Sequence, residues 1–169
     1  PMKDHNYLIT VDVARGLGND YSAFVVFDIT NFPYKAVAKY RNNEIKPMLF
    51  PSIIDDIGKA YNKAFILCEV NDIGDQVASI LNYDLEYDNL LMCSQRGRAG
   101  QVVGAGFSGK RSQLGVRTTQ AVKKLGCSNL KTLLEDDKIL IIDYDIISEL
   151  TTFSQKHNSF EAEEGCNDD

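Results

Sequence analysis

The sequence lacks any run approaching the roughly 18 consecutive apolar residues that a membrane-spanning helix needs. Its first residues, 1–6, also lack the charged-then-apolar layout of a secretory signal. Apolar residues nevertheless make up 44% of the 169-residue chain, which is enough for a sizeable core. We therefore expect a soluble cytosolic protein with one domain and no membrane partner.

Cysteine and histidine are scarce and badly spaced for metal binding or cross-linking. No C-x-x-C pair occurs, and only His5 and His157 are present to assist the thiols. This pattern supports neither a zinc cage nor a disulfide framework. We predict free thiols, mainly in or near the core, at Cys68, Cys93, Cys127 and Cys166.

Acidic residues are absent between Asp88 and Glu135, although the net charge of the chain is -6. That net charge argues against a nucleic-acid partner, but the way the charges are distributed along the chain argues for one. The basic residues of this interval are Arg96, Arg98, Lys110, Arg111, Arg117, Lys123, Lys124 and Lys131, and acids gather at Glu161, Glu163, Glu164, Asp168 and Asp169. A basic sector and an acidic pole suit a polyanion and divalent cations, respectively.

Two apolar runs near the N-terminus, Leu8–Val13 and Phe24–Phe27, flank a turn rich in Gly, Asn and Asp. This pattern predicts a β-hairpin. Asp12 lies inside the first run, on its less apolar face, where a carboxylate is costly unless a cation meets it. The alternative from this hairpin alone is a strand-end carboxylate that reaches water.

A strand at Tyr34–Arg41 follows, and then an amphipathic helix at Pro47–Lys63 whose early register is interrupted by Pro51. The apolar run Ala64–Glu69 predicts a central strand, buried on both faces and reached by a helical crossover, and hence a mixed sheet. It ends in Glu69, at the sheet edge where α/β proteins usually bind ligands. Asp72 or a neighbour is expected to cap the next helix, Ile73–Leu81. The alternative for Glu69 is a solvated carboxylate in an Asx-type turn.

The remaining chain alternates further strands and helices. We predict strands at Asn89–Cys93 and Asp137–Ile142, a weak strand at Ser159–Glu164, and a helix at Tyr144–Phe153. A helix at Leu114–Leu134 is expected to be interrupted at Gly126–Asn129, and Ser94–Ser112 to form a glycine-rich basic loop or hairpin.

Within the basic segment, the sequence from Gly104 to Lys110 matches the phosphate-binding pattern G-x-x-x-x-G-K. The next residue is Arg111, where such a loop needs Ser or Thr to hold magnesium, so nucleotide binding is weakly supported. Contact of Lys110 and Arg111 with DNA phosphates is the better functional interpretation. A solvated basic loop is the structural alternative.

Carboxylates beside turns come from three distant segments: Asp12, Glu69, and Asp168 or Asp169. Hard oxygen ligands gathered in this way suit Mg²⁺ or Mn²⁺. The order of three antiparallel strands, helix, strand, helix and strand also matches an RNase H-like sheet.

The chain resembles the nuclease domain of the large terminase subunit of tailed bacteriophages, the DNA-packaging motor, and the myophage branch in particular. The resemblance is carried by Val11–Gly16 with Asp20–Ala23, by Cys68–Gly74, and by Glu163–Asp169. It implies an α/β, RNase H-like (RuvC-type) mixed central sheet flanked by helices. It also implies a metal-dependent endonuclease that cuts concatemeric double-stranded viral DNA, with little sequence preference, by two-metal phosphodiester hydrolysis.

By that resemblance the catalytic and metal-binding residues are Asp12, Glu69 and one of the final pair. Asp169 is favoured over Asp168 because Cys166 stands where relatives have a histidine three residues before the ligand. Asp12 would bridge the two ions, and Asp20 would be a further or supporting ligand. DNA-backbone contacts would come from Arg96, Arg98, Lys110 and Arg111.

The resemblance also implies a biological setting. Residues 1–169 would be a single nuclease domain, excised from the C-terminal part of a subunit and lacking the upstream packaging ATPase and a terminal helix. The implied partners are double-stranded DNA, that ATPase domain, the portal and the small terminase subunit. The protein would act in the host cytoplasm, transiently at the procapsid, and would be absent from the mature virion.

Three other functions are compatible with parts of the pattern. A RuvC/RNase H-like structure-specific nuclease would use the same acids. A non-catalytic domain that docks DNA or a partner would carry them as a solvated acidic pole. A phosphate-binding half of an actin-like or sugar-kinase ATPase also opens with an Asp-bearing hairpin, but no second copy of this hairpin occurs in the chain.

Overall fold

A five-stranded mixed sheet forms the centre of the computed structural model, which describes residues 1–95, 101–104, 112–156 and 159–166. Its strands are β1 (Tyr7–Asp12), β2 (Ser22–Asp28), β3 (Tyr34–Asn42), β4 (Phe65–Cys68) and β8 (Ile139–Leu140), in the order β4-β1-β2-β3-β8. Consecutive strands β1, β2 and β3 pair antiparallel, whereas β4 runs parallel to β1. The predicted hairpin, third strand and mixed sheet are therefore confirmed.

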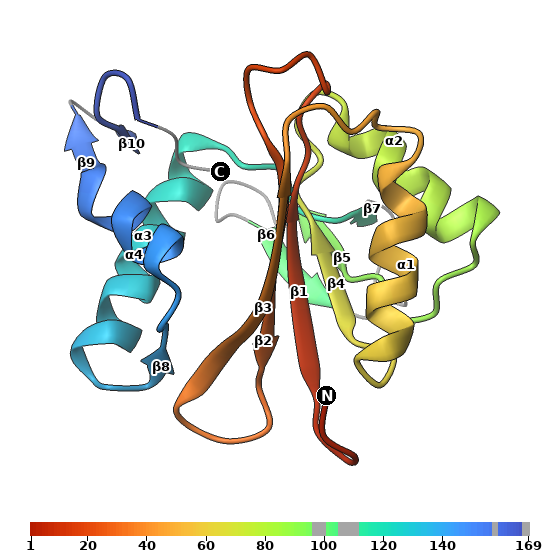
Figure 1. Ribbon diagram of the computed structural model, residues 1–169, viewed down its shortest axis with the longest axis horizontal. Helices are drawn as coiled ribbons and strands as arrows, with labels where there is room; N and C mark the ends of the chain where they lie inside the picture. The colour runs from red at the N-terminus through yellow and green to blue at the C-terminus, as the bar shows by residue number, and fades with distance from the viewer. Residues whose placement is uncertain (96–100, 105–111, 157–158, 167–169) are drawn as a thin grey trace.

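Helices cover both faces of the sheet, which is seen edge-on in Figure 1 with α1 and α2 on one side and α3 and α4 on the other. Helix α1 (Phe50–Ala60) is the crossover between β3 and β4. It begins later than predicted, and Pro51 stands in its first turn rather than interrupting it, because a first-turn proline loses no intrahelical hydrogen bond.

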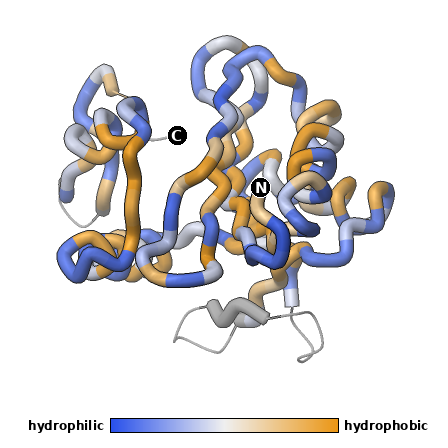
Figure 2. Tube along the Cα trace, turned by 60° about the horizontal axis from the view of Figure 1, so that its bottom comes forward, coloured by the Kyte–Doolittle hydropathy of each residue, from blue (hydrophilic) through white to orange (hydrophobic). Residues whose placement is uncertain are grey.

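The main core lies between the sheet and α1. Along β1 the burial alternates, so that Ile9 and Val11 face this core while Thr10 and Asp12 face the other way and are half-buried. Phe50 and Ile54 of α1 are completely buried against it. Figure 2 shows apolar stretches running through the central strands and the helices beside them. Asp12 thus lies on the less apolar face, as predicted.

Strand β4 is not buried on both faces, and this prediction is wrong. Ile66 and Cys68 are buried, but Phe65 is 40% exposed and Leu67 is partly exposed. Beyond β4, the described part of the chain continues the sheet as isolated bridges, which pair Ile66 with Leu90 and Glu69 with Val116. The apolar run reflects one buried face plus a half-covered one, a distinction that composition alone cannot make.

Helix α2 (Gly74–Ser79) follows β4 and continues into one π-helical turn, η1 (Ile80–Asp84). No side chain caps α2, and Asp72, the predicted cap, is paired elsewhere. The basic segment that follows contributes β5 (Met92–Gln95), β6 (Gln101–Gly104) and β7 (Ser112–Leu114), which form a separate three-stranded sheet. The expected hairpin is therefore confirmed by the antiparallel pairing of β5 with β6.

Helix α3 (Gln120–Glu135) runs without a break through Gly126–Asn129, so the predicted interruption is wrong. Thr119 caps its N-terminus by accepting a hydrogen bond from the Val122 N–H. A glycine costs a helix only about 1 kcal/mol, which a capped helix of 16 residues tolerates. Helix α4 (Tyr144–Thr152) is capped at its N-terminus by Asp143, whose carboxylate accepts hydrogen bonds from two backbone N–H groups. It is followed by the hairpin of β9 (Phe153–Lys156) and β10 (Ser159–Ala162).

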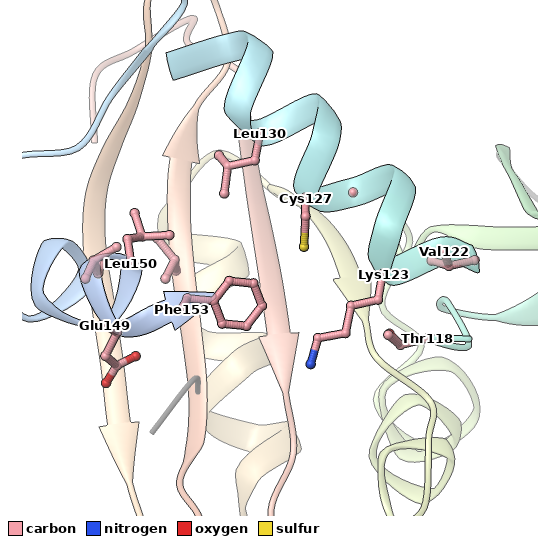
Figure 3. A pocket seen from close by; sticks show the side chains of 11 residues that line it. Thr118, Val122, Lys123, Cys127, Leu130, Glu149, Leu150 and Phe153 are labelled. Atoms are coloured by element: carbon pink, nitrogen blue, oxygen red, sulfur yellow. The ribbon is translucent and has the colours of Figure 1, made fainter. Parts of the chain in front are cut away.

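Polar contacts attach α4 to the sheet. Lys39 of β3 pairs with Asp143 and Asp145, and Arg41 pairs with Glu149 at 2.9 Å. Neither α3 nor α4 contains a fully buried residue. A cavity of about 400 Å³ lies between the two helices and β2, and Figure 3 shows Cys127, Leu130 and Phe153 beside it.

All four cysteines are free, as predicted. Cys68 and Cys93 are buried, whereas Cys127 is half-buried and Cys166 is exposed. Among the helices that the structure describes, none is sufficiently long and apolar to span a bilayer.

Candidate metal centre

Asp12 and Glu69 lie side by side at the same end of two neighbouring parallel strands. Val11 of β1 is in register with Cys68 of β4, and the Glu69 N–H donates to the Val11 carbonyl at 2.9 Å. Asp12 directly follows Val11, and Glu69 directly follows Cys68. Because neighbouring strands are about 4.8 Å apart, the two carboxylates start from adjacent backbone positions.

Both carboxylates project to the half-exposed face of the sheet. Asp12 follows Thr10, and Glu69 follows Leu67, in the alternation that places Val11 and Cys68 in the opposite, buried face. A cavity of about 280 Å³ opens there, lined by Thr10, Val11, Asp12, Ala23, Phe24, Val25, Leu67, Glu69, Val116 and Thr118. The structure therefore brings Asp12 and Glu69 to one cavity.

One oxygen of each carboxylate accepts a hydrogen bond from a nearby N–H group. The Val13 N–H donates to Asp12 Oδ1 at 2.7 Å, and the Asn71 side chain donates to Glu69 Oε1 at 2.8 Å. Such bonds restrict how each carboxylate can turn. The neighbouring Cys68 is completely buried, and burial raises the pKa of its thiol to about 12, so it stays neutral and does not compete as a ligand.

The turns that follow the two acids are tied to each other. Arg15, three residues after Asp12, makes a two-point contact with Asp72, at 2.8 and 2.6 Å from Asp72 Oδ2 and Oδ1. This pairing raises the pKa of Arg15 and lowers that of Asp72. Arg15 and Asp72 thus join the β1–β2 loop to the β4–α2 turn, next to the site.

Two glycines allow close backbone packing beside Glu69. A Cβ on Gly74 would lie 2.0 Å from the Glu69 carbonyl oxygen, and one on Gly115 would lie 2.2 Å from the Cys68 carbonyl oxygen. Gly115 also has a φ of +70°, a conformation that favours glycine. At Gly74 and at Gly115, the chain therefore packs against the backbone of Cys68 and Glu69 too closely for a side chain.

The other predicted site residues are not placed in this cavity. Asp20 is exposed in the β1–β2 loop and does not line it. Asp168 and Asp169 lie outside the described residues, as do the predicted DNA contacts Arg96, Arg98, Lys110 and Arg111. Within the described ranges, no group of three acidic, histidine or cysteine side chains could hold a metal.

Sequence reasoning assigned no role at the site to Asn71 or Thr118. The Asn71 amide donates to Glu69 Oε1 and also to the Thr118 carbonyl, at 3.0 Å, and Thr118 lines the acidic cavity. Only the position of Asn71, two residues after the predicted ligand, could have drawn attention to it. Thr118 and Val25 also line the larger cavity beside α3 and α4, so the two cavities adjoin.

The fold and these paired carboxylates define an RNase H-like domain: three antiparallel strands, a crossover helix, and a parallel strand that brings a second acid beside the first. The family described as Terminase RNaseH-like domain matches residues 9–169. The chain belongs to this family.

Solved structures of viral terminase nucleases share the fold. The large terminase nuclease of thermophilic phage G20c, with bound magnesium, is 20% identical over 98% of this chain and 76% of that one, with a TM-score of 0.71. The corresponding domain of Thermus phage P74-26 is 22% identical over 95% and 72%, with a TM-score of 0.63. The human cytomegalovirus terminase nuclease domain, soaked with manganese, is 7% identical over 88% and 77%, with a TM-score of 0.54.

Proposed function

We propose that this protein is a metal-dependent endodeoxyribonuclease that cuts concatemeric double-stranded DNA during viral genome packaging. The observation that carries the proposal is the placement of Asp12 and Glu69 on adjacent parallel strands, lining one cavity. Membership of the terminase RNase H-like family supports it independently. Within that family we assign the chain to the myophage type, on the sequences Val11–Gly16 and Cys68–Gly74.

The donor set fits hard divalent cations. Asp12 and Glu69 offer carboxylate oxygens without a competing thiolate, which suits Mg²⁺ or Mn²⁺. We propose Asp12 and Glu69 as ligands, with Asp169 or Asp168 completing the set and Asp20 as a further candidate. When bound, a pair of such ions supplies an activated water and stabilises the leaving oxygen of the phosphodiester. The related nuclease of phage G20c, solved with magnesium, with zinc and with cobalt, supports dependence on a divalent metal.

The protein's own residues orient the reaction. The hydrogen bonds from Val13 and Asn71 hold the two carboxylates in fixed orientations toward the cavity. We propose that Arg96, Arg98, Lys110 and Arg111 contact the phosphate backbone, which gives affinity with little sequence preference. Substrate placement then rests on charge and shape rather than on base identity.

We further propose that residues 1–169 act as the nuclease domain of a larger subunit that carries a packaging ATPase upstream. Its partners would be double-stranded DNA, the portal and the small terminase subunit. It would act in the host cytoplasm, transiently at the procapsid, and would not remain in the mature virion. No membrane partner is proposed.

Cleavage of supercoiled plasmid in Mg²⁺ or Mn²⁺ tests the proposal. Because metal ions supply several kcal/mol of transition-state stabilisation, Asp12→Asn and Glu69→Gln should each lower the rate on the order of 100-fold or more. Asp56→Asn removes one exposed carboxylate on α1, which covers the face of the sheet opposite to Asp12 and Glu69, and should leave cleavage unchanged.

Equal cleavage by wild type and the purified Asp12→Asn protein would overturn the proposal. If the wild type bound DNA but did not cleave it in either metal, the protein would instead be a docking domain. A strong preference for four-way junctions over linear duplex would identify a structure-specific nuclease of the RuvC kind.

A further inference from the structure

Asn71 makes the side-chain contact that joins the Glu69 carboxylate to another part of the chain. Its Nδ2 atom lies 2.8 Å from Glu69 Oε1 and 3.0 Å from the Thr118 carbonyl oxygen. Both partners are acceptors, so the atom between them must be the NH₂ group, and the orientation of the amide is fixed by chemistry. Both of its N–H donors are thereby used.

The Thr118 end of this contact is anchored independently. The segment before it is bonded to the strand that carries Glu69: Val116 donates to the Cys68 carbonyl at 2.8 Å and accepts from the Val70 N–H at 2.9 Å. After it, Thr119 caps α3. Asn71 therefore holds Glu69 against a backbone segment that is itself fixed on both sides.

This arrangement determines how Glu69 faces the cavity. A glutamate has three side-chain torsions and loses rotamer freedom when it binds a metal. The bond from Asn71 occupies Oε1, and among the described residues no second side chain donates to this carboxylate. With Oε1 held, Oε2 is presented to a ligand in one orientation.

We propose that Asn71 is a positioning residue that pre-orients Glu69 for divalent-metal binding and couples it to the segment leading into α3. The proposal rests on the proposed function, because it assigns Glu69 as a metal ligand. Asn71 itself contributes no ligand atom. Its removal should weaken metal binding without removing any metal-binding group.

Titration calorimetry with Mn²⁺ alone, on the metal-free protein, tests this role. Loss of a hydrogen-bond partner of a ligand typically lowers metal affinity about 10- to 100-fold. We expect that loss for Asn71→Ala and also for Asn71→Leu, which keeps the volume but not the donor. Asn89→Ala is the matched control, because the Asn89 amide donates to the Lys63 carbonyl away from the site, and it should bind Mn²⁺ as wild type does.

A second readout separates positioning from general damage. In plasmid cleavage, the Mn²⁺ concentration for half-maximal rate should rise in both Asn71 variants, while the rate at saturating Mn²⁺ recovers. Asn71 is half-buried in a turn outside the core, so both variants should retain the circular dichroism spectrum of the wild type.

Unchanged Mn²⁺ affinity in either folded Asn71 variant would overturn the positioning role while leaving the nuclease proposal intact. Absence of Mn²⁺ binding in the wild type, or equal binding by Glu69→Gln and wild type, would overturn the metal-site assignment, and the Asn71 proposal with it. These results are distinguishable in a single series of titrations.

Discussion

Gly74 shows how a residue without a side chain can constrain the backbone that carries the Glu69 carboxylate. It lies five positions after Glu69, where its N–H donates to the Asn71 carbonyl and its Cα packs against the Glu69 backbone. Its φ is not in the left-handed region, so the requirement is close approach rather than backbone freedom. A methyl group here has no room unless the Glu69–Gly74 turn opens.

We expect Gly74→Ala to destabilise the protein by about 1–3 kcal/mol, the usual cost of forcing a methyl into packed surroundings. The new Cβ would lie 2.0 Å from the Glu69 carbonyl oxygen, so relief requires displacement of the backbone that carries Glu69. Urea denaturation measures the stability loss, and plasmid cleavage measures the accompanying loss of activity.

Gly126→Ala is the control for this substitution. A Cβ at Gly126 meets no atom within 4 Å, and the position is in the middle of α3. Alanine there should stabilise the protein by up to about 1 kcal/mol, through helix propensity. If both alanine variants had the same stability, crowding at Gly74 would not be the reason for its glycine.

The candidate site could be predicted in part from single residues. Asp12 stood out because a carboxylate interrupts an apolar alternation, and Glu69 because it ends an apolar run. Asn71, Arg15 and Asp72 carry no such signal, since polar residues in turns are ordinary. Their roles depend on contacts between segments distant in sequence, separated by 47 residues for Asn71 with Thr118 and by 57 for Arg15 with Asp72, which no local pattern encodes.

At the scale of elements, charge rather than apolar burial holds α4 on the sheet. Lys39 of β3 lies between Asp143, the N-cap of α4, and Asp145 in its first turn. These contacts raise the pKa of Lys39, and the bond from Lys39 is the main cause that lowers the pKa of Asp143. Acidic groups at a helix N-terminus also interact favourably with its dipole.

We predict that Lys39→Met, which keeps the aliphatic stem, loosens the attachment of α4 to β3 and leaves the pair of Arg41 with Glu149 in place. Amide hydrogen exchange at pH 7 should become several-fold faster across Tyr144–Thr152, while β1 exchanges as in the wild type. Lys35→Met on the same strand is the control, because no carboxylate among the described residues forms an ion pair with Lys35. Equal exchange of α4 in both variants would contradict the ionic attachment.

The stability difference between wild type and Lys39→Met should also depend on pH. The folded pKa of Asp143 is depressed, so its contribution is present above about pH 4 and is lost as pH falls through the folded value. The folded pKa of Lys39 is raised, so its contribution is present below about pH 10.4 and is lost as pH rises further. Urea midpoints at pH 3 and pH 7 measure the acid side, where the two proteins should converge.

Element prediction succeeded where periodicity was strong and failed where context decided. The hairpin β1–β2 and the crossover helix α1 follow from alternation and amphipathic spacing. The break expected at Gly126 did not occur, because the Thr119 cap and the length of α3 outweigh a weak helix former. The strand predicted at Asp137–Ile142 shrinks to Ile139–Leu140, the part that pairs with β3.

At the scale of the molecule, the two faces of the sheet differ in packing. The α1 and α2 face contains the continuous core, whereas the α3 and α4 face carries the acidic cavity and the larger adjoining one. A sheet with one loosely covered face can expose two carboxylates at its strand ends without unfolding. The cost is that Asp12 and Glu69 are like charges held on neighbouring strands.

These two neighbouring carboxylates make global stability a reporter of metal binding. A cation that binds the folded state at about 100 times its dissociation constant stabilises it by about 2.7 kcal/mol, since the unfolded chain does not keep the two carboxylates together. For a chain of this size, that corresponds to a rise in Tm of roughly 5–10 °C.

We therefore expect Mg²⁺ or Mn²⁺ to raise the Tm of the wild type in scanning calorimetry. Asp12→Asn should abolish most of the metal-induced rise, whereas Asp56→Asn, which changes the net charge equally, should keep the full rise. A metal-induced rise of the same size in Asp12→Asn and wild type would place the bound cation elsewhere.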